Sequence, residues 1–207
     1  MFITFEGGEG SGKTTCIREA AAALRVQGYD VLLTREPGGT LLGDALRTLL
    51  LDAKSQAPVS SRAELLLFCA ARAQLVTEVL QPHLAKGGIV LCDRYADSTL
   101  AYQGYGRGLP LETLRRILAF ATDGLWPQMT LYLDIAPEKG LQRRRRQEWD
   151  RLDSLEISFH QRVHDGYEAL MAQEPSRWRR IDAALPLEQV CQSVIQTIQQ
   201  GLSSRNA

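Results

Sequence analysis

The chain has 207 residues, of which 44% are hydrophobic and 23% are charged, as in ordinary soluble globular domains. Its 24 Lys and Arg residues balance its 24 Asp and Glu residues, so a protein that coats nucleic acid or an anionic membrane is not expected. The length favours one domain over residues 1–207.

Short apolar runs alternate along the chain with longer segments of helical periodicity. Continuous rather than alternating hydrophobicity is typical of strands covered on both faces of a parallel sheet. The runs predict strands at residues 2–5, 31–33, 89–92 and 129–133, with a weaker fifth at 178–181. The helical segments are 13–27, 41–51, 62–80, 111–121, 153–172 and 186–200. This order predicts an α/β fold, a doubly wound parallel sheet of about five strands flanked by helices.

Cysteine usage and the start of the chain bear on its location. No basic segment or long apolar run precedes residues 2–5, so we expect no signal peptide, no membrane span and a cytoplasmic protein. Cytosolic cysteines are usually reduced, and buried thiols behave as small hydrophobes. We therefore expect four reduced cysteines, most of them in the core: Cys16, Cys69, Cys92 and Cys191.

Two local side-chain patterns have simple structural interpretations. Ser61 and Glu64 have the spacing of a capping box at the start of the third helix. His160 and His164 lie four residues apart, but no zinc-protease glutamate follows His160, so we interpret both as solvated helix residues.

A glycine-rich phosphate loop joins the first predicted strand to the first predicted helix. Its sequence fits G-x-x-x-x-G-K-[ST], and the strand before and helix after it are the context that this motif requires. Lys13 is expected to reach the β- and γ-phosphates of ATP, and the Thr14 hydroxyl is expected to help hold Mg²⁺. The residues expected to bind the nucleotide are Gly7, Gly8, Glu9, Gly10, Ser11, Gly12, Lys13 and Thr14.

Asp93 and Arg94 follow the third predicted strand. An acidic residue at this strand end suits a second Mg²⁺ contact made through water; an Asp that caps the next loop is the alternative. Arg94 would place a cation between two phosphate sites, where it stabilises the charge of a moving phosphoryl group.

A phosphate loop alone does not define a function. The N-K-x-D motif of a regulatory GTPase is excluded, because Asn206 is the only asparagine. The sequence shows none of the further motifs expected of a motor or AAA-type ATPase. Two alternatives stay open: a kinase for a different nucleoside monophosphate, and a P-loop ATPase that binds a protein partner. Phosphate transfer that depends on a nucleoside monophosphate separates them.

Three further motifs follow one another along the chain. They are R-E-P-G-G-T at 35–40, L-L-F-x-x-x-R at 66–72 and D-R-Y-x-x-S-T-x-A-Y-Q-G at 93–104. In these motifs, and over nearly its whole length, the chain resembles bacterial thymidylate kinases of the P-loop nucleoside monophosphate kinase superfamily. The resemblance implies a homodimeric ATP:dTMP phosphotransferase that serves dTTP biosynthesis.

The resemblance also implies roles at the matching positions of the base and phosphate sites. Phe68 would stack on thymine, while Arg72 and Gln103 would hydrogen-bond the edge of the base. Arg47 and Arg94 would hold the phosphate of dTMP.

The remaining implied contacts surround the sugar and the adenine. Glu36 and Thr99 would lie near the dTMP phosphate. Glu9 would take the deoxyribose 3′-hydroxyl, and Tyr102 would lie against C2′ and disfavour a ribose. The segment 181–186 resembles the loop that lies along adenine.

A catalytic arginine is expected outside the phosphate loop, because this loop has no basic side chain at position 10. Some thymidylate kinases carry a basic residue inside this loop, where the present chain has Gly10. The charge is then expected from a helical lid at approximately 139–153, which contains a run of arginines and would close over both substrates. The expected catalytic residues are Glu9, Lys13, Arg94, Arg143 and Arg151, with Arg145 or Arg146 as further candidates.

Overall fold

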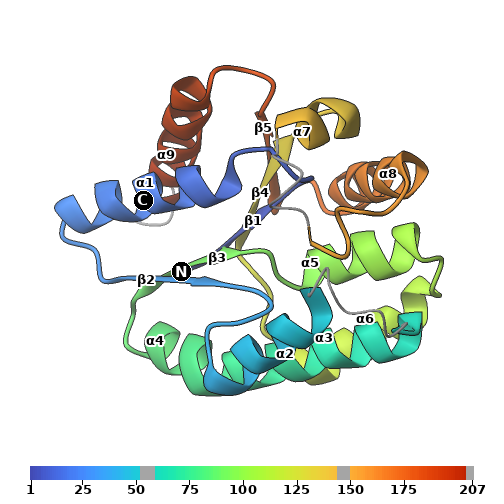
Figure 1. Ribbon diagram of the computed structural model, residues 1–207. Coiled ribbons are helices and arrows are strands. Elements are labelled where there is room, and N and C mark those ends of the chain that lie inside the picture. Colours follow the sequence, from blue (N-terminus) through green and yellow to red (C-terminus); the bar gives the residue numbers. More distant parts are fainter. Residues whose placement is uncertain (52–58, 144–149, 204–207) are drawn as a thin grey trace.

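The structure is a computed structural model that describes residues 1–51, 59–143 and 150–203, and its centre is a sheet of five parallel strands (Figure 1). The strand order is β2-β3-β1-β4-β5. Each predicted strand is confirmed, but each extends one or two polar residues beyond the apolar run that predicted it. The strands are β1 Phe2–Glu6, β2 Val31–Arg35, β3 Ile89–Asp93, β4 Met129–Asp134 and β5 Trp178–Asp182.

The helices follow the predicted pattern and add several short segments. In the described part of the chain they are α1 Lys13–Val26, α2 Leu41–Leu51, α3 Ser61–Leu75, the π-helical η1 Val76–Leu80, α4 Gln81–Ala85, α5 Ala96–Thr99, the π-helical η2 Leu100–Gly106, α6 Leu111–Thr122, α7 Pro137–Arg143, α8 Ile157–Gln173 and α9 Leu187–Ser203. None of these helices is long and apolar enough to cross a membrane.

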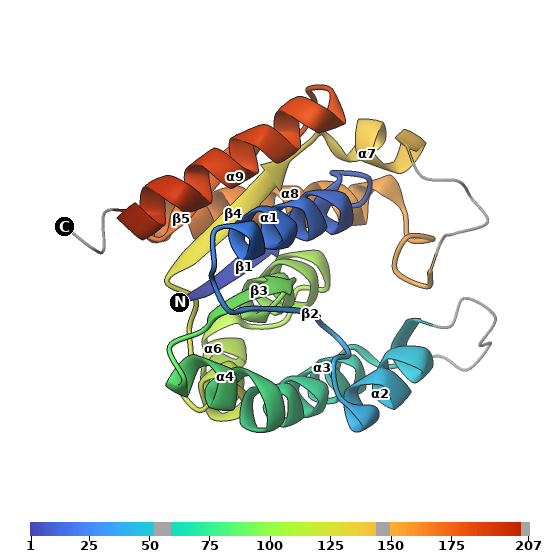
Figure 2. The same cartoon turned by 90° about the vertical axis from the view of Figure 1, so that its left-hand side faces the viewer.

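Two helical layers cover the two faces of the sheet. Figures 1 and 2 show α1 and α9 together on one side and α3, α4 and α6 on the other. Ile3 and Phe5 of β1 point into a core with α1 and α9, whereas Phe2 joins a second core with α3, α6 and α8. Because successive strand residues face opposite sides, a sheet buried on both faces needs the continuous apolar runs seen in the sequence.

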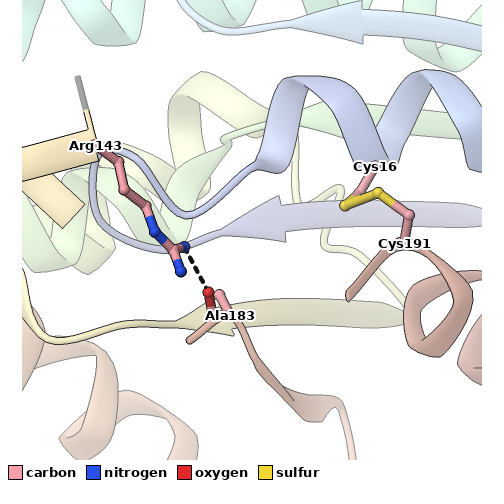
Figure 3. Close-up of a disulfide and its surroundings, with 4 residues drawn as sticks. All are labelled: Cys16, Arg143, Ala183 and Cys191. Atoms are coloured by element: carbon pink, nitrogen blue, oxygen red, sulfur yellow. Dashed lines mark hydrogen bonds between the residues drawn. A yellow bond between two sulfur atoms is a disulfide. The ribbon is translucent and has the colours of Figure 1, made fainter. Parts of the chain in front are cut away.

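A disulfide joins the two helices of the first layer, which corrects the prediction that all four cysteines are reduced. Cys16 of α1 and Cys191 of α9 are bonded across the contact between these helices, with their Cα atoms 4.6 Å apart (Figure 3). The two cysteines are 175 residues apart in the chain, so no local pattern pairs them. Cys69 and Cys92 are free and buried, as predicted.

Two predicted helix starts also need correction. Ser60, not Ser61, caps α3, since its hydroxyl oxygen accepts a hydrogen bond from the Ala63 amide at 3.3 Å. Helix α8 begins at Ile157 rather than at residue 153. The Asp150 carboxylate accepts hydrogen bonds from the amides of the two residues that follow Arg151, and this turn ends before the helix begins.

Candidate active site

A cavity of about 580 Å³ lies at the carboxyl ends of β1, β2 and β3. In a parallel α/β sheet this edge is where ligands bind. The cavity is lined by the phosphate loop, by the ends of β2 and β3, and by α2, α3 and η2. Most of the predicted site residues line it: Glu9, Gly10, Ser11, Gly12, Lys13, Thr14, Glu36, Arg47, Phe68, Arg72, Asp93, Arg94, Thr99, Tyr102 and Gln103.

The phosphate loop is held in shape by its own lysine. The Lys13 ammonium donates to the carbonyl oxygens of Gly7 at 3.0 Å and Gly8 at 2.8 Å. Burial, with a further contribution from the nearby Arg94, lowers the pKa of Lys13 to about 8. Lys13 is therefore still mostly protonated at neutral pH and available to an incoming phosphate.

Thr14 and Asp93 meet at the base of the cavity. The Thr14 hydroxyl donates to the Asp93 carboxylate at 3.0 Å. A hydroxyl and a carboxylate are hard oxygen donors of the type that Mg²⁺ prefers, and Mg²⁺ at nucleotide sites is usually held by one or two such groups plus phosphates. The pair thus fits the predicted metal contact.

Helix α7 packs against the phosphate loop through two glycines. Gly10 has φ +69°, and a Cβ built on it would lie 2.0 Å from the backbone oxygen of Gly140. A Cβ on Gly140 would in turn lie 2.2 Å from the carbonyl oxygen of Glu9. Both positions therefore require glycine for the close approach of two backbones.

Arg94 occupies the turn after β3 and lies beside the phosphate loop. It has φ +69°, which is unusual for a residue with a side chain. Its guanidinium donates to the Gly7 carbonyl at 3.1 Å, pairs with the Glu9 carboxylate and lies 5.0 Å from the centre of the Tyr102 ring. Glu9, Arg94 and Tyr102 thus form one cluster at the mouth of the loop.

Glu6 supports this turn from below, and sequence reasoning did not identify it. Its buried carboxylate accepts hydrogen bonds from the Tyr95 amide at 2.9 Å and from the hydroxyls of Ser98 and Tyr167. Burial, reinforced by the nearby Asp97, raises the pKa of Glu6 to about 7. A single charged residue at the end of an otherwise uncharged strand, next to the phosphate loop, is the signal that could have found it.

Arg72 is almost fully buried and mostly engaged by protein acceptors. Its Nε donates to Glu36 Oε2 at 2.8 Å, and its Nη2 donates to the same oxygen at 2.6 Å. The Nη2 group also donates to the Tyr95 carbonyl at 3.1 Å, and the Nη1 group donates to the Thr99 hydroxyl at 3.0 Å. A guanidinium has five N–H groups, two of them on Nη1. The second Nη1 hydrogen donates to no oxygen or nitrogen atom of the described residues and is available to a ligand in the cavity that Arg72 lines.

Two arginines and an aromatic ring complete the wall formed by β2, α2 and α3. Arg47 donates to the Pro37 carbonyl at 3.0 Å, and burial, then the neighbouring Arg35, lowers its pKa. Arg35 also lines the cavity, although no role was predicted for it. Phe68 is half-buried, with its ring between the cavity and the core.

The two described lid arginines lie outside the cavity lining, on either side of it. Arg143 donates to the Ala183 carbonyl at 2.7 Å (Figure 3). It also donates to the carbonyls of Ala184 at 3.1 Å and Gly10 at 3.5 Å. Arg151 donates to the Leu50 carbonyl at 2.9 Å and pairs with a glutamate of α3. The candidates at residues 145 and 146 lie outside the described residues.

The two histidines of α8 are not freely solvated, which corrects that prediction. His160 is buried, and the Nε2 atom of His164 lies 3.0 Å from the Asp134 carboxylate. Asp134, His164 and Glu168 are close enough to share a metal ion. However, Arg180 pairs with both Asp134 and Glu168 and already balances these carboxylates.

Known proteins match the chain over nearly its full length. Residues 5–194 match the family model described as "Thymidylate kinase". The chain is 50% identical to the thymidylate kinase of Roseiflexus castenholzii, with 99% of this chain and 95% of that protein covered. It is 47% identical to the thymidylate kinase of Bacillus pumilus, with coverages of 98% and 96%. The crystal structure of thymidylate kinase from Ehrlichia chaffeensis superposes with a TM-score of 0.79 at 34% identity, over 96% of this chain and 98% of that one.

Proposed function

Because the chain belongs to the thymidylate kinase family, we propose that it transfers the γ-phosphoryl group of ATP to dTMP, giving ADP and dTDP for dTTP synthesis. The observation that carries this proposal is the shared cavity, which has the phosphate loop in one part of its lining and Phe68, Arg72 and Gln103 in another. One continuous space can thus hold the phosphates of a donor beside a flat, hydrogen-bonding base.

The donor side of the proposal rests on the phosphate loop. Lys13 would exchange its hydrogen bonds to loop carbonyls for the β- and γ-phosphate oxygens of ATP. Thr14 and Asp93 would hold Mg²⁺, Asp93 through water. When bound, this ion would neutralise negative charge on the phosphates during transfer.

The acceptor side uses the wall across from the loop. Phe68 would stack on thymine, and the free Nη1 hydrogen of Arg72 would donate to a carbonyl oxygen of the base. Arg47 and Arg94 would hold the dTMP phosphate, because both guanidiniums line the cavity near the loop.

The sugar contacts follow from the cluster around Arg94. The Glu9 carboxylate accepts a hydrogen bond from the Tyr102 hydroxyl at 3.3 Å, so these two side chains would flank the deoxyribose together. Glu36 and Thr99 accept hydrogen bonds from Arg72 and would also lie near the dTMP phosphate.

The lid arginines remain candidates for charge stabilisation during transfer. Arg143 is bonded both to the phosphate loop and to residues 183 and 184, which belong to the segment expected along adenine. Arg151 would reach the phosphates only after leaving its glutamate partner. A lid over residues 139–153, one domain, a homodimer and a cytoplasmic location belong to the same proposal.

A coupled ADP-release assay with ATP and Mg²⁺ tests the reaction. We expect strong turnover with dTMP, weaker turnover with dUMP, and little with UMP, dCMP, AMP, GMP or no acceptor. Lys13→Met should lower kcat/KM by about 100-fold or more, since a buried charge-assisted contact to phosphate is lost. The exposed Lys86→Met is the matched control and should change nothing. Equal turnover with and without an acceptor would instead indicate an ATPase.

A further inference from the structure

Glu64 of α3 is a fully buried carboxylate surrounded by donors. It accepts hydrogen bonds from Gln103 Nε2 at 2.9 Å and from Arg107 Nε at 3.3 Å and Nη2 at 3.1 Å, and it pairs with Arg151. Burial opposes its ionisation, but these hydrogen bonds outweigh burial and hold the pKa of Glu64 below its ordinary value. Glu64 is therefore ionised at neutral pH, and an ionised carboxylate can only accept hydrogen bonds.

This restriction fixes the orientation of the Gln103 amide. An acceptor-only partner requires the NH₂ end of the amide, so the carbonyl oxygen of Gln103 must point the other way. No described residue donates a hydrogen bond to that oxygen. Because Gln103 lines the cavity beside Phe68, the oxygen is left to face the base pocket.

The orientation decides which base the pocket accepts. Thymine and uracil present an N–H group between two carbonyl oxygens, whereas cytosine presents a lone pair and an amino group at the corresponding positions. A carbonyl oxygen from Gln103 pairs with the N–H of thymine and faces the lone pair of cytosine. The second Nη1 hydrogen of Arg72 acts in the same direction as the Gln103 oxygen, because a donor pairs with a carbonyl oxygen of thymine but not with the amino group of cytosine.

We propose that Glu64 is a positioning residue that fixes the Gln103 carbonyl oxygen toward the base and so makes the site select thymine and uracil over cytosine. This inference rests on the proposed function, since it concerns the acceptor of the same reaction. Glu64 does not touch the substrate; it acts through Gln103. Arg107 and Arg151 balance its charge and keep the carboxylate in its ionised form.

Glu64→Gln tests the proposal because the new amide at position 64 can donate as well as accept. The Gln103 amide is then free to turn over and present its NH₂ end to the pocket. We expect the ratio of kcat/KM for dTMP to that for dCMP to fall by about 10-fold or more, mainly through KM, with KM for ATP unchanged. Equilibrium binding of dTMP and dCMP should show the same loss of preference. Glu78→Gln, an exposed change in η1 of the same chemistry, is the matched control and should leave the ratio unaltered.

A charge-preserving double variant separates orientation from simple disruption of the cluster. In Glu64→Gln/Gln103→Glu the cluster keeps one carboxylate, and an acceptor oxygen again faces the base. This variant should fold and recover the preference for dTMP over dCMP. If Glu64→Gln shows no cooperative melting transition, the double variant alone tests the proposal. A double variant that does not fold, or that folds without preferring dTMP over dCMP, contradicts the proposal.

Two results identify what has failed. If the wild type transfers phosphate to dTMP but Glu64→Gln keeps the wild-type ratio of dTMP to dCMP, the orienting role of Glu64 is wrong while the proposed function stands. If the wild type shows no transfer that depends on dTMP, the proposed function is wrong, and this inference is contradicted with it.

Discussion

At the scale of single residues, the contact between Gly10 and Gly140 limits what the phosphate loop can carry. The space that a side chain at position 10 would occupy is filled by the backbone of α7. A basic side chain at this point of the loop would need α7 to move. Packing therefore excludes a basic side chain at position 10, and any cation besides Lys13 near the γ-phosphate is expected from residues outside the loop.

Gly10→Ala should disrupt this contact. The added Cβ meets backbone atoms, which cannot give way as a flexible side chain would, so α7 must shift and the loop with it. We expect kcat/KM for ATP to fall by about 10-fold or more, as a few kcal/mol of strain are added at the loop. Steady-state kinetics and thermal melting measure the two effects.

Gly28→Ala is the matched control for backbone strain. Gly28 has φ +87°, but a Cβ there meets no atom within 4 Å. The control should lower stability by about 1 kcal/mol and leave kcat/KM unchanged. If Gly10→Ala behaved in the same way, the contact with α7 would have no role in shaping the loop.

Residues that belong to contiguous motifs could be predicted from the sequence, whereas their supports could not. Lys13 and Thr14 stand in a local pattern with a known geometry, whereas Phe68 belongs to a motif that carries the family resemblance. Glu6 and Glu64 act through residues that lie far away in the chain, such as Tyr95 and Gln103. For Glu64 the nearest local explanation, a capping box, was wrong because a tertiary ion cluster takes its carboxylate.

At the scale of elements, all five strands were predictable because burial on both faces demands apolar runs. The polar residues that end the strands were left out of the predicted ranges, because those ranges followed the apolar runs. Among these residues, Asp93 lines the cavity and Glu6 supports the turn after β3. None of α4, α5, η2 and α8 has a side-chain hydrogen bond at its N-cap, so these short segments and the shifted start of α8 depend on tertiary packing. Hydrophobic periodicity over so few residues does not define them.

The disulfide between α1 and α9 belongs to this scale because it ties the helix after the phosphate loop to the last helix. Cys191→Ser should lower the free energy of unfolding by about 2–4 kcal/mol under oxidising conditions, a typical value for closing a long loop. Chemical denaturation with and without a reductant measures it, and in reductant most of the difference should disappear.

Cys69→Ser provides the control for this prediction. Cys69 is a free, buried thiol, so its replacement should have the same effect with and without reductant. If Cys191→Ser were equally insensitive to reductant, or if the wild type showed four reactive thiols after denaturation without reductant, the bond between α1 and α9 would not exist in solution.

At the scale of the whole molecule, the parallel sheet brings the ends of β1, β2 and β3 to one edge. Residues as far apart in the chain as Glu9 and Gln103 therefore line one cavity. The order of strands and motifs along the chain, together with the parallel sheet, predicted this convergence. They did not predict where Arg143 and Arg151 lie, since both bond to acceptors that only the folded chain brings near.

The most direct measurement follows the phosphoryl group itself. ATP labelled in the γ-phosphoryl group is incubated with Mg²⁺ and dTMP, and the products are separated. A site that holds both substrates in one cavity predicts that the label appears in dTDP in step with ADP, with little in inorganic phosphate. Label released as inorganic phosphate at the same rate with and without dTMP would contradict the account.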